Sequence, residues 1–265
     1  MTSPVLLDFA EGVATLTLNR PDVLNALSVE MMKALADAVA QLSRRGDYRV
    51  VVLQGAGAHF MAGGDLQEFS AALNLSPESR LVNFRALIEQ YINPVVEGLQ
   101  ALPVPVVGRV QGACVGFGLS LVLGCDLVLA EEQACFSTAY AGIGVSGDGG
   151  VSWFLPRIVG RRKALELLLL ADRIDARQAL SLGIVNRVVA TGHLDAAVSA
   201  LIDQLKAGCR RTQAEIKALL NQSPDQSLPA QLQLEGEAFA RCTSRPGFDE
   251  GVRAFLARRK PEFRD

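Results

Sequence analysis

Two glycine-rich segments, one of which holds a candidate catalytic carboxylate, carry the clearest chemical signal in this sequence. The first covers residues 112–120 and contains Gly116-Phe117-Gly118 just before an apolar helix. The second covers residues 142–150 and contains Asp148. Glycine lets the main chain approach a ligand closely, and the free N–H groups at the start of a helix attract anions. Such donors beside one carboxylate suggest proton transfer next to a carbonyl group.

The composition is typical of a soluble globular enzyme. The chain has 265 residues, of which 49% are hydrophobic and 20% charged, so it can bury a substantial core. Its formal net charge of −2 offers no basic excess for binding nucleic acid. No apolar run reaches the ~18 residues of a membrane span. We therefore expect a cytoplasmic protein that binds neither nucleic acid nor membranes.

The cysteines and histidines show no metal-binding or disulfide pattern. The five cysteines are odd in number and none lies in a CxxC motif, so we expect reduced thiols. His59 and His193 are too few and too far apart for a histidine-based metal site. No GxxxxGK[ST] or GxGxxG motif opens a βαβ unit. We expect no metal and no separate cofactor.

Apolar strands, glycine turns and helices alternate along the chain, which predicts an α/β fold. Ser28 is expected to cap a helix, and residues 80–101 to form a long helix, kinked near Pro94. The polar residues 70–79 suggest a mobile loop. Strands are expected at 5–9, 13–19, 50–53, 106–110, 127–130, 134–137 and 184–189. Further helices are expected at 119–123, 162–171 and 176–182.

The last part of the chain has a different character from the rest. From His193 onward it is helical and amphipathic, with a Ser/Pro break near residues 223–229. We therefore divide the chain into a core of residues 1–192, which carries the site, and a helical region of residues 193–265.

Several motifs in a fixed order resemble the enoyl-CoA hydratase/isomerase (crotonase) superfamily. The resemblance runs from about residue 5 to the C-terminus. Its motifs are Asn19-Arg20-Pro21, Leu24-Asn25-Ala26-Leu27, residues 60–66 (FMAGGDL), residues 112–118, Cys125-Asp126-Leu127, residues 154–160 and residues 179–185. The resemblance implies a crotonase-like spiral of ββα units followed by a C-terminal helical trimerisation region. It also implies an acyl-CoA thioester as substrate, with coenzyme A as part of it, and a homotrimer or a hexamer built from two trimers.

The resemblance assigns roles to individual positions. In the family, two main-chain N–H groups bind the thioester oxygen, and by position these belong to Gly64 and Phe117. Ala26, Ala62 and Leu66 fall where relatives line the CoA site, and Lys260 where a cation could meet the CoA phosphates. Preorganised donors of this kind contribute roughly 3–4 kcal/mol each to the stabilisation of a developing oxyanion.

The sequence departs from the hydratases of this family at both catalytic positions. Hydratases use two glutamates, and here those positions hold Ser120 and Tyr140. Adding water across a double bond needs one group to activate the water and one to protonate carbon. Asp148 lies where some family isomerases carry their base, and a lone carboxylate can take a proton from one carbon and return it to another. We therefore expect a double-bond isomerase with Asp148 as base and with Tyr140 and Ser120 in the catalytic site.

Other interpretations remain open at this point. Asp148 could activate water with Tyr140 supplying the second proton, which would make the protein a hydratase. It could act as a nucleophile, as in the related aryl-CoA dehalogenases, or merely cap the next helix. Ser120 as a hydrolytic nucleophile lacks both a GxSxG motif and a histidine partner. A non-catalytic acyl-CoA-binding scaffold is the alternative from another class.

Overall fold

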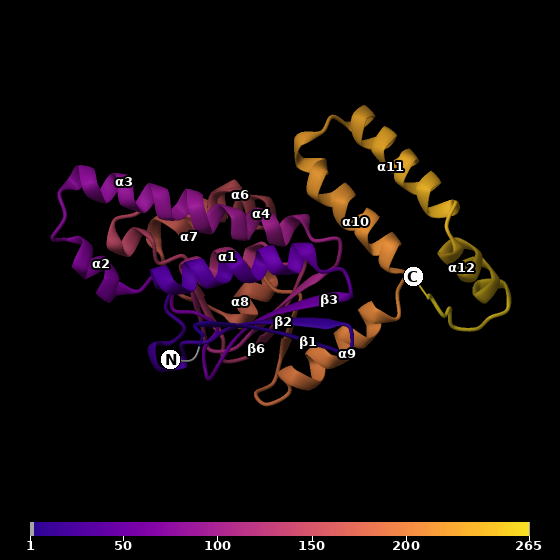
Figure 1. Cartoon of the computed structure of the whole chain (residues 1–265), viewed down its shortest axis with the longest axis horizontal. Coiled ribbons are helices and arrows are strands. Elements are labelled where there is room, and N and C mark those ends of the chain that lie inside the picture. The colour runs from indigo at the N-terminus through magenta and orange to yellow at the C-terminus, as the bar shows by residue number, and fades with distance from the viewer. Residues whose placement is uncertain (1–2, 265) are drawn as a thin grey trace.

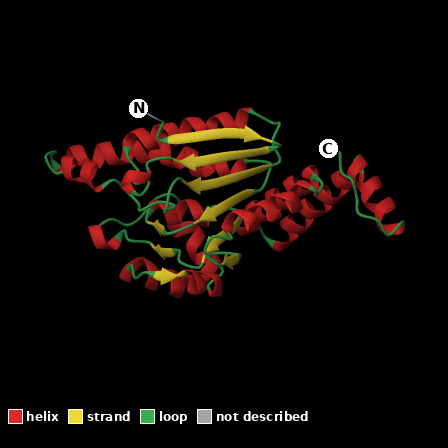
Figure 2. Cartoon of the chain, turned by 90° about the horizontal axis from the view of Figure 1, so that it is seen from below, coloured by secondary structure: helices red, strands yellow, loops and turns green. Residues whose placement is uncertain are grey.

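A six-stranded sheet forms the centre of the core (Figures 1 and 2). The computed structural model describes residues 3–264. In sheet order, the strands are β1 (Val5–Ala10), β2 (Val13–Leu18), β3 (Val50–Gly55), β4 (Val106–Val110), β6 (Leu127–Glu131) and β9 (Arg187–Val189). β1 and β2 are antiparallel and the other neighbours are parallel. A second sheet joins β5 (Ala113–Val115), β7 (Cys135–Ser137) and β8 (Ile174–Asp175). This mixed α/β architecture agrees with the expected fold class.

Helices cover both faces of the central sheet, which explains its continuous apolar strands. Val50 to Leu53 of β3 are at most 4% exposed. Val51 and Leu53 belong to the larger core, on the side of α1 (Val29–Arg44) and α4 (Asn93–Ala101), whereas Val50 and Val52 pack in a second cluster with α9 (Leu194–Lys206). Successive strand residues point to opposite faces, so each strand needs apolar side chains throughout.

The first helices start where the sequence indicates, but the segment after them is more regular than expected. Ser28 caps α1 by accepting a hydrogen bond from the N–H of Met31. The expected loop at residues 70–79 is mostly wrong, because α2 (Leu66–Ala72) and the start of α3 (Pro77–Leu87) occupy most of it. α3 continues through one π-helical turn, Ile88–Ile92, into α4, so the long helix is confirmed and its irregular turn immediately precedes Asn93-Pro94.

The remaining helices of the core are short. They are η1 (Pro21–Val23), α5 (Phe117–Leu123), η3 (Ala141–Ile143), α6 (Val151–Val159), α7 (Arg161–Leu170) and α8 (Ala176–Ser181). α5 begins two residues earlier than expected, directly after Gly116. The strand expected at 184–189 is shorter, because pairing in β9 starts only at Arg187.

Three helices project from one end of the core (Figures 1 and 2). They are α10 (Arg210–Gln222), α11 (Leu228–Thr243) and α12 (Pro246–Leu256), with the short turn η4 (Ser223–Asp225) between the first two. α9 lies within the range expected for the helical region, yet it packs on the central sheet. The projecting part therefore begins at α10. Within residues 3–264, no helix is both long and apolar enough to cross a membrane.

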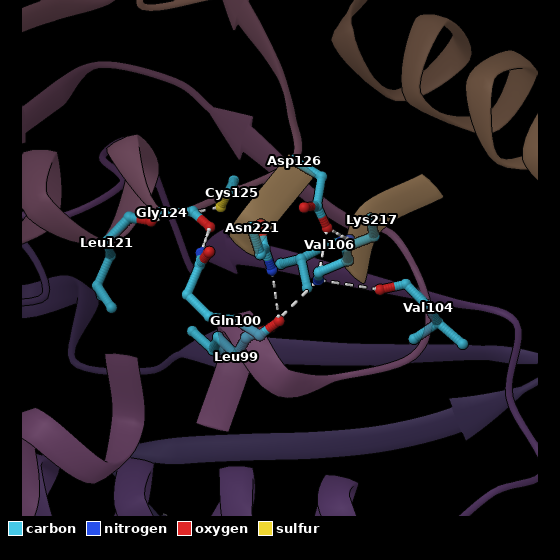
Figure 3. A network of polar contacts seen from close by, with 10 residues as sticks. All are labelled: Leu99, Gln100, Val104, Val106, Leu121, Gly124, Cys125, Asp126, Lys217 and Asn221. Carbon is cyan, nitrogen blue, oxygen red and sulfur yellow. Dashed lines mark hydrogen bonds and ion pairs between the residues drawn. The ribbon is translucent and has the colours of Figure 1, made fainter. Parts of the chain in front are cut away.

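A buried ion pair anchors α10 to the core (Figure 3). Lys217 Nζ lies 2.7 Å from Asp126 Oδ2 and donates to the carbonyl oxygens of Leu99 and Val104, both at 3.2 Å. Asp126 also accepts the N–H of Val106 at 2.7 Å. A buried charge is tolerated when it is paired and fully hydrogen-bonded, which is the arrangement here.

Candidate active site

The first glycine-rich segment, residues 112–120, lies in direct main-chain contact with the motif of residues 60–66. A Cβ placed on Gly116 would lie 3.2 Å from Gly63 Cα, and one on Gly63 would lie 3.3 Å from the carbonyl oxygen of Val115. Both glycines have positive φ, +91° at Gly63 and +57° at Gly116. Larger residues would strain the backbone and push the segments apart. The contact places Gly64 beside the start of α5.

Two main-chain N–H groups at this contact are free to bind a ligand. The N–H of Leu27 donates to the carbonyl oxygen of Gly63 at 2.8 Å, and the carbonyl oxygen of Leu27 accepts from the N–H of Asp65 at 3.0 Å. The N–H of Gly64, which lies between these two bonds, takes no part in the pairing. Phe117 is the first residue of α5, where helical N–H groups lack intrahelical acceptors. Within residues 3–264, neither N–H donates a hydrogen bond. A pair of unengaged donors of this kind can stabilise an oxyanion.

The carboxylates closest in sequence to Gly64 are committed to helix ends. Asp65 caps α2 by accepting the N–H of Gln67 at 3.0 Å, and it pairs with Arg20 at 2.9 Å. Burial opposes its charge, but these hydrogen bonds outweigh burial and lower the pKa of Asp65. Glu68 accepts the N–H of Val29 at 2.8 Å, at the start of α1. Both carboxylates therefore stabilise helix ends through hydrogen bonds and are not free to act as a base.

Asp148 lies in a cluster with Tyr140 and Ser120, the two residues expected at the glutamate positions of the hydratases. Tyr140 donates its hydroxyl hydrogen bond to Asp148 Oδ1 at 2.8 Å. Ser120 Oγ lies 2.8 Å from the Tyr140 hydroxyl and 2.9 Å from the main-chain oxygen of Asp148. Among the described residues, no hydrogen bond reaches Asp148 Oδ2. One carboxylate oxygen is thus held and the other is available for a substrate.

Glycines bring the Asp148 loop onto the helix that carries Phe117. Gly149 has φ +61°, and a Cβ there would lie 2.7 Å from the Phe117 ring and 2.9 Å from Ser120 Cβ. Gly147 would meet the ring of Tyr140 at 3.2 Å in the same way. α5 therefore carries one of the two unengaged N–H groups and also contacts the loop that carries the carboxylate.

Burial controls the acid–base properties of this cluster. It raises the pKa of Asp148, and the hydrogen bond from Tyr140 offsets this only in part. Burial, followed by the charge of Asp148, raises the pKa of Tyr140 far above its usual range. Tyr140 is therefore a neutral hydrogen-bond donor, whereas Asp148 is a more strongly basic carboxylate than an exposed aspartate.

The remaining positions named by the resemblance fall into two groups. Ala26 and Ala62 lie in segments that are joined to each other near Gly64, since the N–H of Ala62 donates to Leu24 at 3.0 Å. Leu66 follows on α2 and is 61% exposed. Lys260 follows α12 (Pro246–Leu256), the last of the projecting helices.

Two residues that support the site were not assigned a role from the sequence. Asn25 is fully buried with φ +56°, and its side-chain amide donates to the carbonyls of Ala56 and His59 at 2.9 and 2.8 Å. His59 accepts the N–H of Ala113 at 3.0 Å through Nδ1 and so links the start of the 60–66 motif to the segment of residues 112–120. The Leu24-Asn25 motif held the signal for Asn25, because asparagine tolerates positive φ.

The described residues hold no cluster of three or more His, Cys, Asp or Glu side chains that could bind a metal ion. The site consists of main-chain donors, one carboxylate and two hydroxyl groups.

Fold and site define an enzyme of the crotonase superfamily. The chain belongs to the enoyl-CoA hydratase/isomerase family, whose sequence profile matches residues 8–265. It is 36% identical over 260 residues to the 1,2-epoxyphenylacetyl-CoA isomerase of Escherichia coli (strain K12), covering 98% of this chain and 97% of that one. It is 30% identical over 254 residues to 4-chlorobenzoyl coenzyme A dehalogenase-2 of an Arthrobacter species, covering 96% and 91%. The crystal structure of an enoyl-CoA hydratase from Mycobacterium smegmatis superposes with a TM-score of 0.90 at 36% identity and 99% coverage of both chains.

Proposed function

We propose that this enzyme shifts a double bond in an enoyl-CoA by moving one proton between two carbons. The observation that carries the proposal is the single carboxylate of the cluster, Asp148, with Oδ1 held by Tyr140 and Oδ2 free of hydrogen bonds among the described residues. The next residue, Gly149, packs against the Phe117 ring and Ser120 Cβ, so the loop that carries Asp148 contacts α5. The name of the Escherichia coli relative supports isomerisation of a CoA thioester as the general class of reaction.

The proposed reaction begins with a 3-enoyl thioester whose carbonyl oxygen accepts from the N–H groups of Gly64 and Phe117. Asp148 Oδ2 takes a proton from C2, and the electron pair of that C–H bond delocalises onto the thioester oxygen. The same carboxyl then delivers the proton to C4, which leaves the double bond between C2 and C3. Each main-chain donor contributes roughly 3–4 kcal/mol to the stabilisation of the enolate.

Hydration is less well supported by the geometry. It needs a second group able to exchange a proton with water or with carbon. Tyr140 donates its hydrogen bond to Asp148, and burial keeps its pKa far above its usual range. Ser120 is 1% exposed and bonds to Tyr140 and to the main chain. Neither hydroxyl matches a second carboxylate in this role.

Self-association is part of the proposal. The projecting helices expose large apolar side chains that a single chain leaves uncovered. Among them are Ile216, Leu220, Leu228, Leu232, Phe239 and Phe255, which are 53–83% exposed. Patches of this kind mark interaction sites, and we infer a homotrimer or a hexamer. In such an assembly Lys260 would be placed to meet the CoA phosphates of a neighbouring subunit's site.

Two substrates distinguish the proposed reaction from hydration. Purified protein is incubated with a trans-3-enoyl-CoA and, separately, with a trans-2-enoyl-CoA, and the absorbance of the conjugated thioester is followed. Isomerisation makes that absorbance appear from the 3-enoyl compound. Its loss from the 2-enoyl compound, with formation of a 3-hydroxyacyl-CoA, would instead identify a hydratase.

A further inference from the structure

The three polar groups of the site form a closed ring of hydrogen-bond contacts. Asp148 Oδ1 and the Tyr140 hydroxyl are 2.8 Å apart, the hydroxyls of Tyr140 and Ser120 are 2.8 Å apart, and Ser120 Oγ is 2.9 Å from the main-chain oxygen of Asp148. All three distances are in the normal range for O–H···O bonds. The fourth contact, from Tyr140 to that main-chain oxygen, is 3.5 Å and too long to count.

The ring lacks one proton when Asp148 is ionised. A carboxylate and a main-chain carbonyl can only accept, so the two hydroxyl protons must serve three contacts. Tyr140 donates to the carboxylate, and the Ser120 hydroxyl can donate either to Tyr140 or to the main-chain oxygen. In both cases the remaining contact of Ser120 has no proton between its two oxygens. With a proton on Oδ1, Asp148 donates to Tyr140, Tyr140 donates to Ser120, and Ser120 donates to the carbonyl. All three contacts are then filled.

The surroundings of the ring make this deficit costly. Ser120 is 1% exposed and Tyr140 9%, so water has little access to the contact between their hydroxyl groups, whereas the Asp148 side chain is half-buried. Neighbouring elements provide little compensating charge. α5 and η3 carry no titratable side chain, Arg157 of α6 is engaged with Trp153, and Glu97 of α4 is exposed. The charged side chains of α7 are exposed (Arg161 and Arg162) or paired with each other (Lys163 and Glu166). Between buried hydroxyl groups, an unmade hydrogen bond costs more than in water.

We infer that Ser120 is a positioning residue that favours the protonated form of Asp148, because its hydroxyl completes the ring only when the carboxyl carries a proton. The inference concerns the free protein, and it rests on the proposed function only in its consequence for turnover. Since a base must be ionised to act, activity is expected to fall as the pH drops through the pKa of Asp148. Ser120 moves that loss of activity to higher pH.

Variants of the two hydroxyl residues test the inference. In Ser120→Ala, Tyr140 can donate to the carboxylate without leaving another contact empty, so Asp148 should titrate at lower pH, by about one pH unit, the size of one hydrogen bond. In the Tyr140→Phe background, Ser120 has no hydroxyl through which to reach the carboxyl, so Ser120→Ala should cause no further shift. The titration is followed by the infrared C=O stretch of the protonated carboxyl, identified by its absence in Asp148→Asn.

Thr138→Val is the matched control. Thr138 is 1% exposed and donates to the carbonyl of Leu167 at 2.7 Å, outside the ring. Its replacement should leave the titration of Asp148 unchanged. A titration midpoint of Ser120→Ala that stays in place or moves to higher pH would overturn the inference. So would an equal shift caused by Ser120→Ala in the native and in the Tyr140→Phe background. Ser120→Cys, whose thiol is only a weak hydrogen-bond donor, should shift the midpoint in the same direction as Ser120→Ala and keeps the test decisive if the alanine variant does not fold.

The pH dependence of turnover separates this inference from the proposed function. The acid limb of kcat/KM for a 3-enoyl-CoA should follow the infrared midpoint in each variant. If the midpoints shift as expected but no enoyl-CoA is isomerised, the function is wrong and the inference stands. If turnover requires Asp148 but Ser120→Ala does not lower the midpoint, the function stands and the inference fails.

Discussion

At the scale of single residues, Asp148 is the one carboxylate of the proposed site and its candidate base. It is buried enough to be a strong base, yet Oδ2 remains unengaged among the described residues. Its partners Tyr140 and Ser120 are hydroxyl groups that fix its position by hydrogen bonds and do not act as a second base. The proposed reaction therefore depends on one carboxylate that would both take and return a proton.

Asp148→Asn should abolish this proton transfer while leaving the fold intact. Asparagine has nearly the same shape and can still accept from Tyr140, but it cannot remove a proton. We expect a loss of about 10²- to 10⁴-fold in kcat for the isomerisation of a 3-enoyl-CoA. Asp195→Asn, which breaks a surface pair with Arg109, is the control and should retain activity. Full activity in Asp148→Asn would remove Asp148 from the mechanism.

The same substitution should make the protein more stable at neutral pH. Burial raises the pKa of Asp148 in the folded state. The neutral carboxyl is therefore favoured by folding, and its contribution is complete below the unfolded pKa, about 4. That contribution is lost as the pH rises through the folded pKa. Asp148→Asn should gain stability over the native chain with rising pH in denaturant titrations, and the opposite trend would show that the fold stabilises the carboxylate.

At the scale of elements, glycine loops hold the site together. The Asp148 loop meets α5 at a contact that only a residue without a side chain permits, and the segment around Gly63 meets Gly116 in the same way. Both contacts place main chain directly against main chain or against a ring. The position of the base relative to the N–H donors is therefore set by loop geometry.

Gly149→Ala should disrupt this arrangement. Its Cβ would lie 2.7 Å from the Phe117 ring, in a backbone conformation with φ +61°. We expect a loss of about 1–3 kcal/mol in stability, accompanied by a lower kcat. Gly144→Ala is the matched control, since φ is +76° there but no atom lies within 4 Å of the added methyl group. Equal activity losses in both variants would attribute the effect to backbone strain alone.

The sequence predicted these elements best where a local signal was present. Ser28 and the apolar face behind it located α1, and the order of the motifs identified the fold. Residues 70–79 were misjudged because their polar composition resembles a loop, although Asp65 and Ser76 cap helices there. The ring could not be foreseen, because Ser120, Tyr140 and Asp148 meet only through tertiary packing. The amphipathic pattern from His193 onward predicted helices, but it did not distinguish α9, which packs on the sheet, from the projecting helices.

At the scale of the whole molecule, polar contacts attach the projecting helices to the core. The polar contacts of Lys217 and Asn221 join α10 to the end of α4 and to the start of β4 (Figure 3). α11 packs on α10, and α12 packs on α11. The anchor at Lys217 therefore helps to hold the whole region in place.

Lys217→Met should loosen this attachment. Removing the ammonium leaves Asp126 partly buried without its cation, and we expect a loss of about 3 kcal/mol in stability. Amide hydrogen exchange should accelerate in α10. Lys163→Met breaks an exposed pair with Glu166 and should cost at most about 0.5 kcal/mol. Equal stabilities of the two variants would contradict the anchoring role.

The exposed apolar faces of these helices predict the mass of the native particle. Light scattering on the purified protein should give about three or six times the chain mass of 28.3 kDa. Replacing Phe239 and Phe255, which are 72% and 83% exposed, by aspartate should produce monomers. A monomeric mass for the native chain at micromolar concentration would disprove self-association.

The use of main-chain donors at Gly64 and Phe117 also has an evolutionary consequence. Side-chain substitution cannot delete an N–H group, so the binding of an enolate oxygen would persist while the residues facing it change. Ser120, Tyr140 and Asp148 are three side chains on two neighbouring segments, and exchanging them needs no new fold. With Gly64 and Phe117 in the proposed role, a few point mutations could change the reaction while the enolate oxygen keeps its binding site.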